Sequence, residues 1–186
     1  MGRVLLVRHG KTEGPLHDRD RIGEVGRDEA RRLAGWLAGE RRGITHVFTG
    51  PARRHAQTLA ALRESLETKG ISLPPETVVP GLDEYDAIGI FDRLLPAWLA
   101  SQGLSLPEPG APVPVDRGAY RVLEGVGTAW AVGALADPAV ESWPAFQARC
   151  VAGLGTLVSV ESKGATVLCT TSAGTIAAIV GHLLGL

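Results

Sequence analysis

The sequence has little of several features that define protein classes. It contains only two cysteines, Cys150 and Cys169, which are far apart and lack metal-ligand spacing. Its 19 lysines and arginines are balanced by 20 acidic residues, so the net charge is −1. With no basic excess, we expect neither a nucleic-acid partner nor an anionic membrane partner. We expect both cysteines to be reduced core thiols of a cytoplasmic protein rather than a disulfide.

Long apolar runs are also missing. The N-terminal run covers only residues 4–7, which is too short for a signal peptide. The apolar stretch Ala173 to Leu186 is too short to cross a bilayer and contains His182, so we expect it to be a buried helix. The sequence therefore predicts no membrane association.

What the chain does have is a core and an alternation of strands and helices. Hydrophobic residues make up 45 % of its 186 residues, enough for one domain. The continuous apolar run at residues 4–7 predicts a buried parallel strand, and further strands are predicted at 44–48, 78–79 and 165–170. Helical spacing and capping signals predict helices over 24–37, 51–67, 91–100 and 143–160, and from residue 172 onward. This alternation indicates an α/β fold with a mainly parallel sheet.

One stretch interrupts the alternation. We expect residues 1–186 to form a single domain with an insertion at about 86–141 lying over the strand ends. Within it, residues 106–115 hold four prolines and are predicted to be a loop, whereas 119–136 contain too many glycines to assign. Its aromatic residues Trp98, Tyr120 and Trp130 could line a substrate site, but we favour a core role.

Polar residues follow the predicted strands. In open α/β sheets, ligands bind beyond the carboxyl ends of the strands. Four polar clusters are expected at such ends and are therefore expected to converge: residues 8–10, 49–54, 83–84 and 170–174.

Several of these segments carry a recognisable pattern. Leu6 to Glu13 is a hydrophobic strand followed by Arg-His-Gly, a polar residue and Thr. The segment Gly50 to Thr58 is similar to the motif Ser-Pro-Leu-x-Arg-Ala-x-Gln-Thr. The segment from Ile22 to Ala30 is similar to the motif Leu-Thr-x-x-Gly-x-x-Gln-Ala, and Leu82-Asp83-Glu84 is similar to the motif Leu-x-Glu. In this order and spacing they resemble the histidine phosphatase (phosphoglycerate mutase-like) superfamily. The resemblance implies a three-layer α/β/α sandwich.

The resemblance also implies roles for individual residues. His9 would be the nucleophile that forms a phosphohistidine, and Arg8 and Arg54 would clamp the phosphoryl oxygens with planar, bidentate donors. Thr12 would add a hydroxyl donor, and Glu84 would protonate the departing alcohol. Such a site acts on phosphorylated small molecules and needs no metal and no cofactor. The chemistry fits, because phosphoryl transfer depends largely on positioning and charge stabilisation.

Simpler interpretations remain open at these positions. Arg8 could be an ion-pair partner at a strand end, and Glu84, like its acidic neighbours Asp83 and Asp86, could be a solvated turn residue. Spacing from Pro51 favours Arg54 over Arg53 as the clamp. Gly10 could let the backbone turn or approach the phosphate, and the helix from Pro51 could offer its N-terminus. We expect the remaining histidines to be structural or surface residues: His17, His46, His55 and His182.

The last motif departs from the family pattern. The family has a strand, Ser-His-Gly and often Gly-Thr-Ile, whereas Val167 to Ile176 places Ser172 where the second histidine should stand. Losing one such donor typically costs about 10²–10³ in rate. The enzyme could be slow, His17, His55 or Lys11 could substitute, or the domain could bind a phosphorylated ligand without turnover. Ser172 could bind phosphate, cap the last helix, or do both.

We therefore predict a phosphomonoesterase that acts through a phosphohistidine at His9, with a catalytically impaired phosphate-binding pseudoenzyme as the alternative. A phosphoglycerate mutase-type phosphotransferase fits less well, because mutases carry a Trp-Asn pair after the first motif and Glu13-Gly14-Pro15 stand here. Family members often have a C-terminal tail, so this chain is expected to be minimal or truncated.

Overall fold

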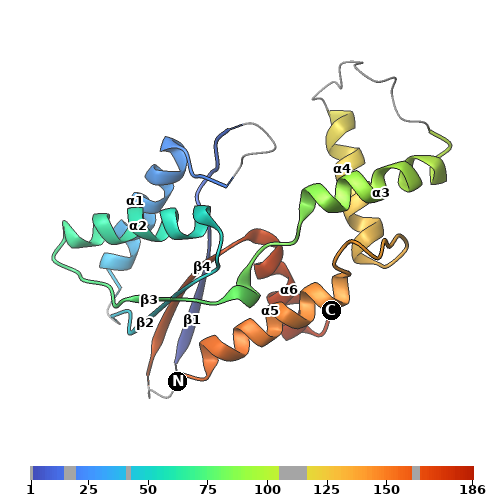
Figure 1. Cartoon of the computed structure of the whole chain (residues 1–186). Coiled ribbons are helices and arrows are strands. Elements are labelled where there is room, and N and C mark those ends of the chain that lie inside the picture. The colour runs from blue at the N-terminus through green and yellow to red at the C-terminus, as the bar shows by residue number, and fades with distance from the viewer. Residues whose placement is uncertain (1, 15–19, 41–42, 105–116, 161–163) are drawn as a thin grey trace. The chain divides into compact units, whose positions relative to one another are not determined.

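The computed structural model describes residues 2–14, 20–40, 43–104, 117–160 and 164–186 (Figure 1). They divide into two compact units, one formed by Met1–Glu84 with Gln147–Leu186 and the other by Tyr85–Phe146. The predicted proline-rich loop at 106–115 lies outside the described residues. A single domain with an insertion at about 86–141 stays a prediction.

The first unit is built on a sheet of four strands among the described residues. The strands are β1 (Arg3–Arg8), β2 (His46–Thr49), β3 (Glu76–Val78) and β4 (Thr166–Thr171), and they pair in the order β1-β4-β2-β3. Every pairing is parallel, with β4 held between β1 and β2. All six residues of β4 are buried, as expected for a parallel strand covered on both faces.

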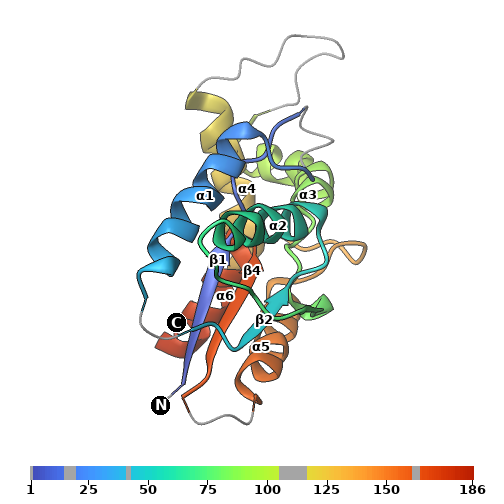
Figure 2. The same ribbon diagram turned by 90° about the vertical axis from the view of Figure 1, so that its left-hand side faces the viewer.

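Helices cover both faces of this sheet. The helices α1 (Glu24–Ala38) and α2 (Arg53–Glu67) lie on one face. On the other face lie α6 (Ala173–Leu184) and the part of α5 (Trp143–Val158) that belongs to this unit (Figures 1 and 2). One core cluster joins α1, α2 and the sheet through Ala34, Leu37, Val47, Leu59, Leu62, Leu66, Leu73 and Leu168. The predicted α/β fold in three layers is confirmed.

The second unit packs two helices, α3 (Ala87–Ser101) and α4 (Arg117–Ala131), against each other. The glycines that left residues 119–136 unassigned do not prevent a helix there. At Gly125 a Cβ would collide with the indole of Trp98, so this glycine permits close packing of α3 and α4. Trp130 is 5 % exposed and contacts the rings of Tyr85, Trp143 and Phe146. Its predicted core role is confirmed.

Helix starts are where the sequence-based expectations were least accurate. The predicted start of α2 at residue 51 is wrong, because α2 begins at Arg53 with Ala52 as its N-cap residue. Neither Thr49 nor Gly50 caps it, because Thr49 still belongs to β2. The helix predicted from residue 91 begins earlier, at Ala87, where Asp86 accepts the N–H of Gly89 as an N-cap.

Both cysteines are core residues, as predicted, and each is 0 % exposed. Burial raises the pKa of the Cys169 thiol to about 12, so this thiol stays protonated and packs as an apolar group. None of the helices described here is long and apolar enough to cross a membrane.

Candidate functional site

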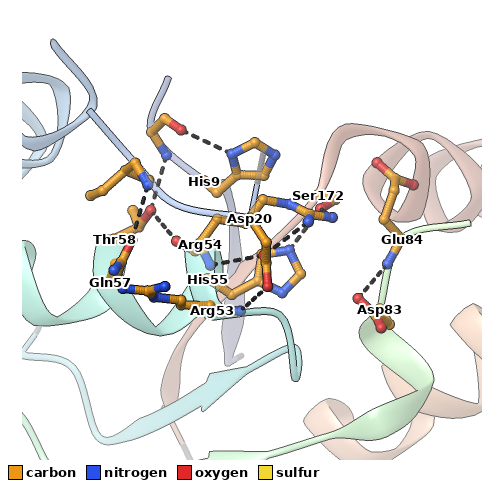
Figure 3. A network of polar contacts seen from close by, with 12 residues as sticks. His9, Asp20, Arg53, Arg54, His55, Gln57, Thr58, Asp83, Glu84 and Ser172 are labelled. Carbon is orange, nitrogen blue, oxygen red and sulfur yellow. Dashed lines mark hydrogen bonds and ion pairs between the residues drawn. The ribbon is translucent and has the colours of Figure 1, made fainter. Parts of the chain in front are cut away.

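The structure brings the four polar clusters together at the carboxyl edge of the sheet. The N–H of His9 donates to Thr171 O at 2.8 Å, and the N–H of Gly50 donates to Thr170 O at 2.9 Å. After β3, a 3₁₀ turn (Pro80–Leu82) leads to Asp83, whose carbonyl accepts the Thr175 hydroxyl at 2.8 Å. Because the strands are all parallel, these ends meet on one side (Figure 3).

His9 follows the last residue of β1 and is half-buried. Its Nδ1 lies 2.9 Å from the carbonyl oxygen of Gly10. A carbonyl oxygen can only accept, so Nδ1 carries the proton and Nε2 of the neutral ring carries the lone pair. Burial is the main cause that lowers the pKa of His9 below 6.5; the charges of Arg54 and Arg8 lower it further, while Gly10 O and Asp20 oppose the shift. The ring is therefore neutral, and Nε2 is nucleophilic, near pH 7.

The backbone after His9 is fixed by close packing against α1. A Cβ on Gly10 would lie 2.5 Å from Gly26 O, and a Cβ on Gly26 would lie 2.5 Å from Lys11 O. The Gly10 N–H donates to Thr58 Oγ1 at 3.0 Å, and that hydroxyl donates to Arg54 O at 2.7 Å. Gly10 has no positive φ among the described glycines, so its role is close approach to α1 rather than a special turn.

Arg54 stands at the start of α2 and is held by two groups. Its Nη1 donates to Asp20 Oδ1 at 3.0 Å and its Nη2 to Ser172 Oγ at 3.3 Å. The Asp20 carboxylate also accepts the backbone N–H of Arg53 at 3.1 Å and of Arg54 at 3.2 Å. Asp20 thereby caps α2 from a distant loop. The N–H groups expected to face a phosphate are thus bonded to Asp20.

Ser172 lies between β4 and α6 and is 0 % exposed. It is the N-cap residue of α6 with extended backbone angles, but its side chain makes no cap hydrogen bond. Its Oγ instead lies 2.7 Å from His55 Nε2. Ser172 therefore stands at the N-cap position that the sequence offered as one alternative, but its hydroxyl does not cap the helix, because Arg54 and His55 hold that hydroxyl.

His55 is a fully buried histidine on α2, and its ring centroid is 5.8 Å from that of His9. Burial, followed by the charges of Arg54 and His9, lowers the pKa of His55 to about 4. A ring with this pKa is neutral at pH 7, so His55 cannot serve there as the substitute cation. His17, another candidate for that role, lies outside the described residues.

Glu84 reaches the start of α6. Its Oε2 accepts the N–H of Gly174 at 3.1 Å, so this carboxyl group satisfies a backbone donor that Ser172 leaves unmet. Figure 3 shows the Glu84 carboxyl on the opposite side of Ser172 from His9. Asp83 bonds the Glu84 N–H through its own side chain at 2.9 Å, so it holds the turn.

The remaining predicted residues lie at the rim. Arg8 ends β1 and is exposed, and Thr12 forms an isolated antiparallel bridge with Ile22. A pocket of about 270 Å³ lies beside His9 and is lined in part by Arg8 and Glu29. No three His, Cys, Asp or Glu side chains gather as a metal site within the ranges that the structure describes.

Sequence reasoning missed the roles of Asp20 and Thr58 in the site, and it named His55 only as a structural or surface residue or a substitute cation, not as the buried partner of Ser172. Asp20 sits in a polar loop with no periodic pattern, so nothing local marks it. Thr58 was visible only as the last residue of the Gly50 to Thr58 motif. His55 had one signal, because it stands where that motif has alanine.

Comparison with known proteins agrees with this fold. No curated protein sequence matches the chain. Among solved structures, a Bacillus anthracis phosphoglycerate mutase has a TM-score of 0.64 at 19 % identity, covering 97 % of this chain and 78 % of its own. A mycobacterial glucosyl-3-phosphoglycerate phosphatase has a TM-score of 0.61 at 21 % identity, with coverages of 97 % and 78 %. A putative alpha-ribazole-5'-P phosphatase from Escherichia coli scores 0.62 at 16 % identity, with coverages of 100 % and 80 %.

The sequence profile of the histidine phosphatase superfamily (branch 1) matches residues 4–95. This range includes β1 with His9, the start of α2 with Arg54, and Glu84. By its matched sequence and its fold, the chain belongs to the histidine phosphatase superfamily.

Proposed function

We propose that the protein is a metal-independent phosphomonoesterase in which His9 accepts the phosphoryl group of a small phosphate ester. One observation carries the proposal: the Gly10 carbonyl fixes the proton on His9 Nδ1 and leaves the Nε2 lone pair beside Arg54. Two structural neighbours are named as phosphatases of small phosphorylated compounds, which supports a substrate of that class.

The proposed reaction has two steps. First, His9 Nε2 attacks phosphorus, the bond from phosphorus to the ester oxygen breaks, and the departing oxygen takes a proton from the Glu84 carboxyl. Arg54, and Arg8 at the end of β1, neutralise charge on the phosphoryl oxygens. Second, water attacks the phosphohistidine, gives its proton back to Glu84, and the P–N bond breaks to release phosphate.

The electrostatics of the site match the first step. Burial lowers the pKa of His9, so the ring stays neutral to a lower pH than an ordinary histidine. We expect kcat/KM to fall on the acid side as His9 takes a proton, with that limb below pH 6.5. An acid limb at pH 7 or above would contradict this assignment of the nucleophile.

The test is hydrolysis of p-nitrophenyl phosphate near pH 6 with a chelator present. Wild type, His9→Ala and the matched control His182→Ala would be compared, because His182 is exposed on the last turn of α6. We expect turnover in wild type and in the control, none in His9→Ala, and acid-labile phosphate on wild type after quenching. Full turnover in His9→Ala would refute the proposal.

A second candidate function is a phosphate-binding domain without turnover. The observation that favours it is the burial of His55 and Ser172, which leaves no second cationic imidazole beside His9 at pH 7 among the residues that the structure describes. Heat stabilisation of the wild type by inorganic phosphate, reduced in Arg54→Ala and without trapped phosphohistidine, would support it. Detection of phosphohistidine on His9 would exclude it.

A further inference from the structure

His55 occupies a place that core packing alone does not explain. It lies on the buried side of α2 with Leu59, Leu62 and Leu66, and its ring is 0 % exposed. Burying an imidazole costs free energy unless its nitrogens are hydrogen-bonded. Here Nε2 meets Ser172 Oγ at 2.7 Å, while Nδ1 makes no hydrogen bond of ordinary geometry to a described residue and faces the backbone of Gly50.

The direction of the hydrogen bonds follows from the partners. Arg54 can only donate, so Ser172 Oγ accepts from Arg54 Nη2 at 3.3 Å. The Ser172 hydroxyl is then available to donate to Nε2 of His55, which places the His55 proton on Nδ1 towards Gly50. The result is one chain of donors running from Arg54 through Ser172 to His55 (Figure 3).

Three departures from the family motifs meet at this point. Gly50 stands where the motif has serine, His55 where it has alanine, and Ser172 where it has histidine. In the structure a Cβ on Gly50 would lie 2.5 Å from His55 Nδ1, and also 2.5 Å from Leu82 O. The absence of a side chain at position 50 is therefore required for the His55 ring to lie where it does.

We infer that His55 and Ser172 are a compensating pair, in which α2 supplies the imidazole missing from the end of β4 and the pair positions Arg54. This inference rests on the proposed role of the site in binding a phosphoryl group. His55 is a positioning residue that acts through Ser172 on the guanidinium of Arg54.

Burial excludes a more direct role. A buried serine next to a histidine could suggest a serine nucleophile, but both residues are 0 % exposed and no substrate atom can reach the Ser172 oxygen. The Ser172 oxygen is also held by Arg54. The pair therefore tunes where Arg54 points, and the phosphoryl group meets Arg54 itself, which keeps 19 % of its side chain exposed.

The experiment compares hydrogen-bonding and apolar replacements of His55, using inorganic phosphate as the probe. His55→Gln keeps a polar atom near the position of Nε2, whereas His55→Leu keeps volume without a partner for Ser172. We expect the Kd for inorganic phosphate to rise about tenfold or more in His55→Leu and in Ser172→Ala, and less than about threefold in His55→Gln. His182→Leu, an exposed replacement, serves as the matched control.

The double variant tests whether the two residues act through one chain. If they do, His55→Leu combined with Ser172→Ala weakens phosphate binding no more than either single change. Multiplying effects, or wild-type phosphate affinity in His55→Leu, would overturn the inference.

The exchange of the two residues covers the case in which single variants fold poorly. Ser172→His alone would force two imidazoles into one buried space and should lower Tm. When Ser172→His is combined with His55→Ala, the loss of Tm should be smaller than the sum of the losses in the two single variants. Additive losses would count against the pair.

The outcomes separate this inference from the proposed function. Phosphate binding can be measured without turnover. If the variants show the expected Kd pattern but the wild type never hydrolyses p-nitrophenyl phosphate, the inference about His55 and Ser172 stands and the proposed phosphatase activity is refuted. If the wild type turns over substrate and His55→Leu changes neither Kd nor kcat, the proposed phosphatase activity stands and the inference about the pair is refuted.

Discussion

Two glycines on α1 allow a matched test of how His9 is held. Both lie within the helix, so replacing either by alanine gains about 1 kcal/mol of helix propensity. No atom of a described residue lies within 4 Å of a Cβ position on Gly35, whereas a Cβ on Gly26 would lie 2.5 Å from Lys11 O and 2.8 Å from Lys11 N. Because backbone atoms cannot rotate away, the loop after His9 has to move, at a cost of about 1–3 kcal/mol.

The propensity gain is common to both variants and cancels in their comparison. We expect Gly35→Ala to raise Tm by about 2–4 °C and Gly26→Ala to be about 1–3 kcal/mol less stable than Gly35→Ala. A shift of the loop also displaces His9, and a misplacement of about 1 Å can cost about 10² in rate. We therefore expect kcat/KM for p-nitrophenyl phosphate to fall about 10- to 100-fold in Gly26→Ala only.

Calorimetry and initial rates on the same preparations would provide both readouts. The reasoning fails if Gly26→Ala raises Tm as much as Gly35→Ala does and leaves turnover unchanged. The added methyl group on α1 would then fit without displacing the loop after His9.

Three further changes have distinct expected results. Arg54→Lys loses the planar guanidinium that bridges Asp20 and Ser172, so kcat/KM should fall about 10²-fold. Arg53 is exposed, so Arg53→Lys should match wild type, and equal effects of the two changes would contradict the assignment of Arg54 as the phosphoryl clamp. Thr58→Val leaves the Gly10 N–H unpaired and should cost about 1–3 kcal/mol in urea unfolding, and no change would show that the bond carries little energy. Burial lowers the pKa of His55 to about 4, so the unfolded chain binds the extra proton between pH 6.5 and about 4, and stability falls as pH falls. His55→Gln should remove up to about 3 kcal/mol of that decline, and identical Tm-against-pH curves would refute it.

Much of the fold follows from local pattern in the chain. The run Val4 to Val7 predicts β1, and the helical spacing of α1 and α2 is strong enough to find both helices. Capping is less predictable, because α2 and α6 take carboxylates from remote loops. Asp20 binds the start of α2 and Glu84 the start of α6, and no local rule links either pair.

The site shows the same division. Motif spacing correctly brings His9, Arg54 and Ser172 to one edge of the sheet, because parallel strands end there together. What pattern cannot give is burial: from the sequence His55 looks like an ordinary helix residue, and only the folded chain buries its ring beside Ser172 and Gly50. Its protonation and its bond to Ser172 exist only in the folded chain, since both depend on desolvation and on a partner 117 positions away.

The position of β4 in the sheet sets an order of events during synthesis. β4 is the last strand described and lies between β1 and β2, which do not pair with each other. A nascent chain that has emerged only as far as β3 therefore exposes the edges of β1 and β2 that pair with β4 in the folded chain. Ser172 follows β4 directly, so the guanidinium of Arg54 gains its second anchor in the same step that completes the sheet.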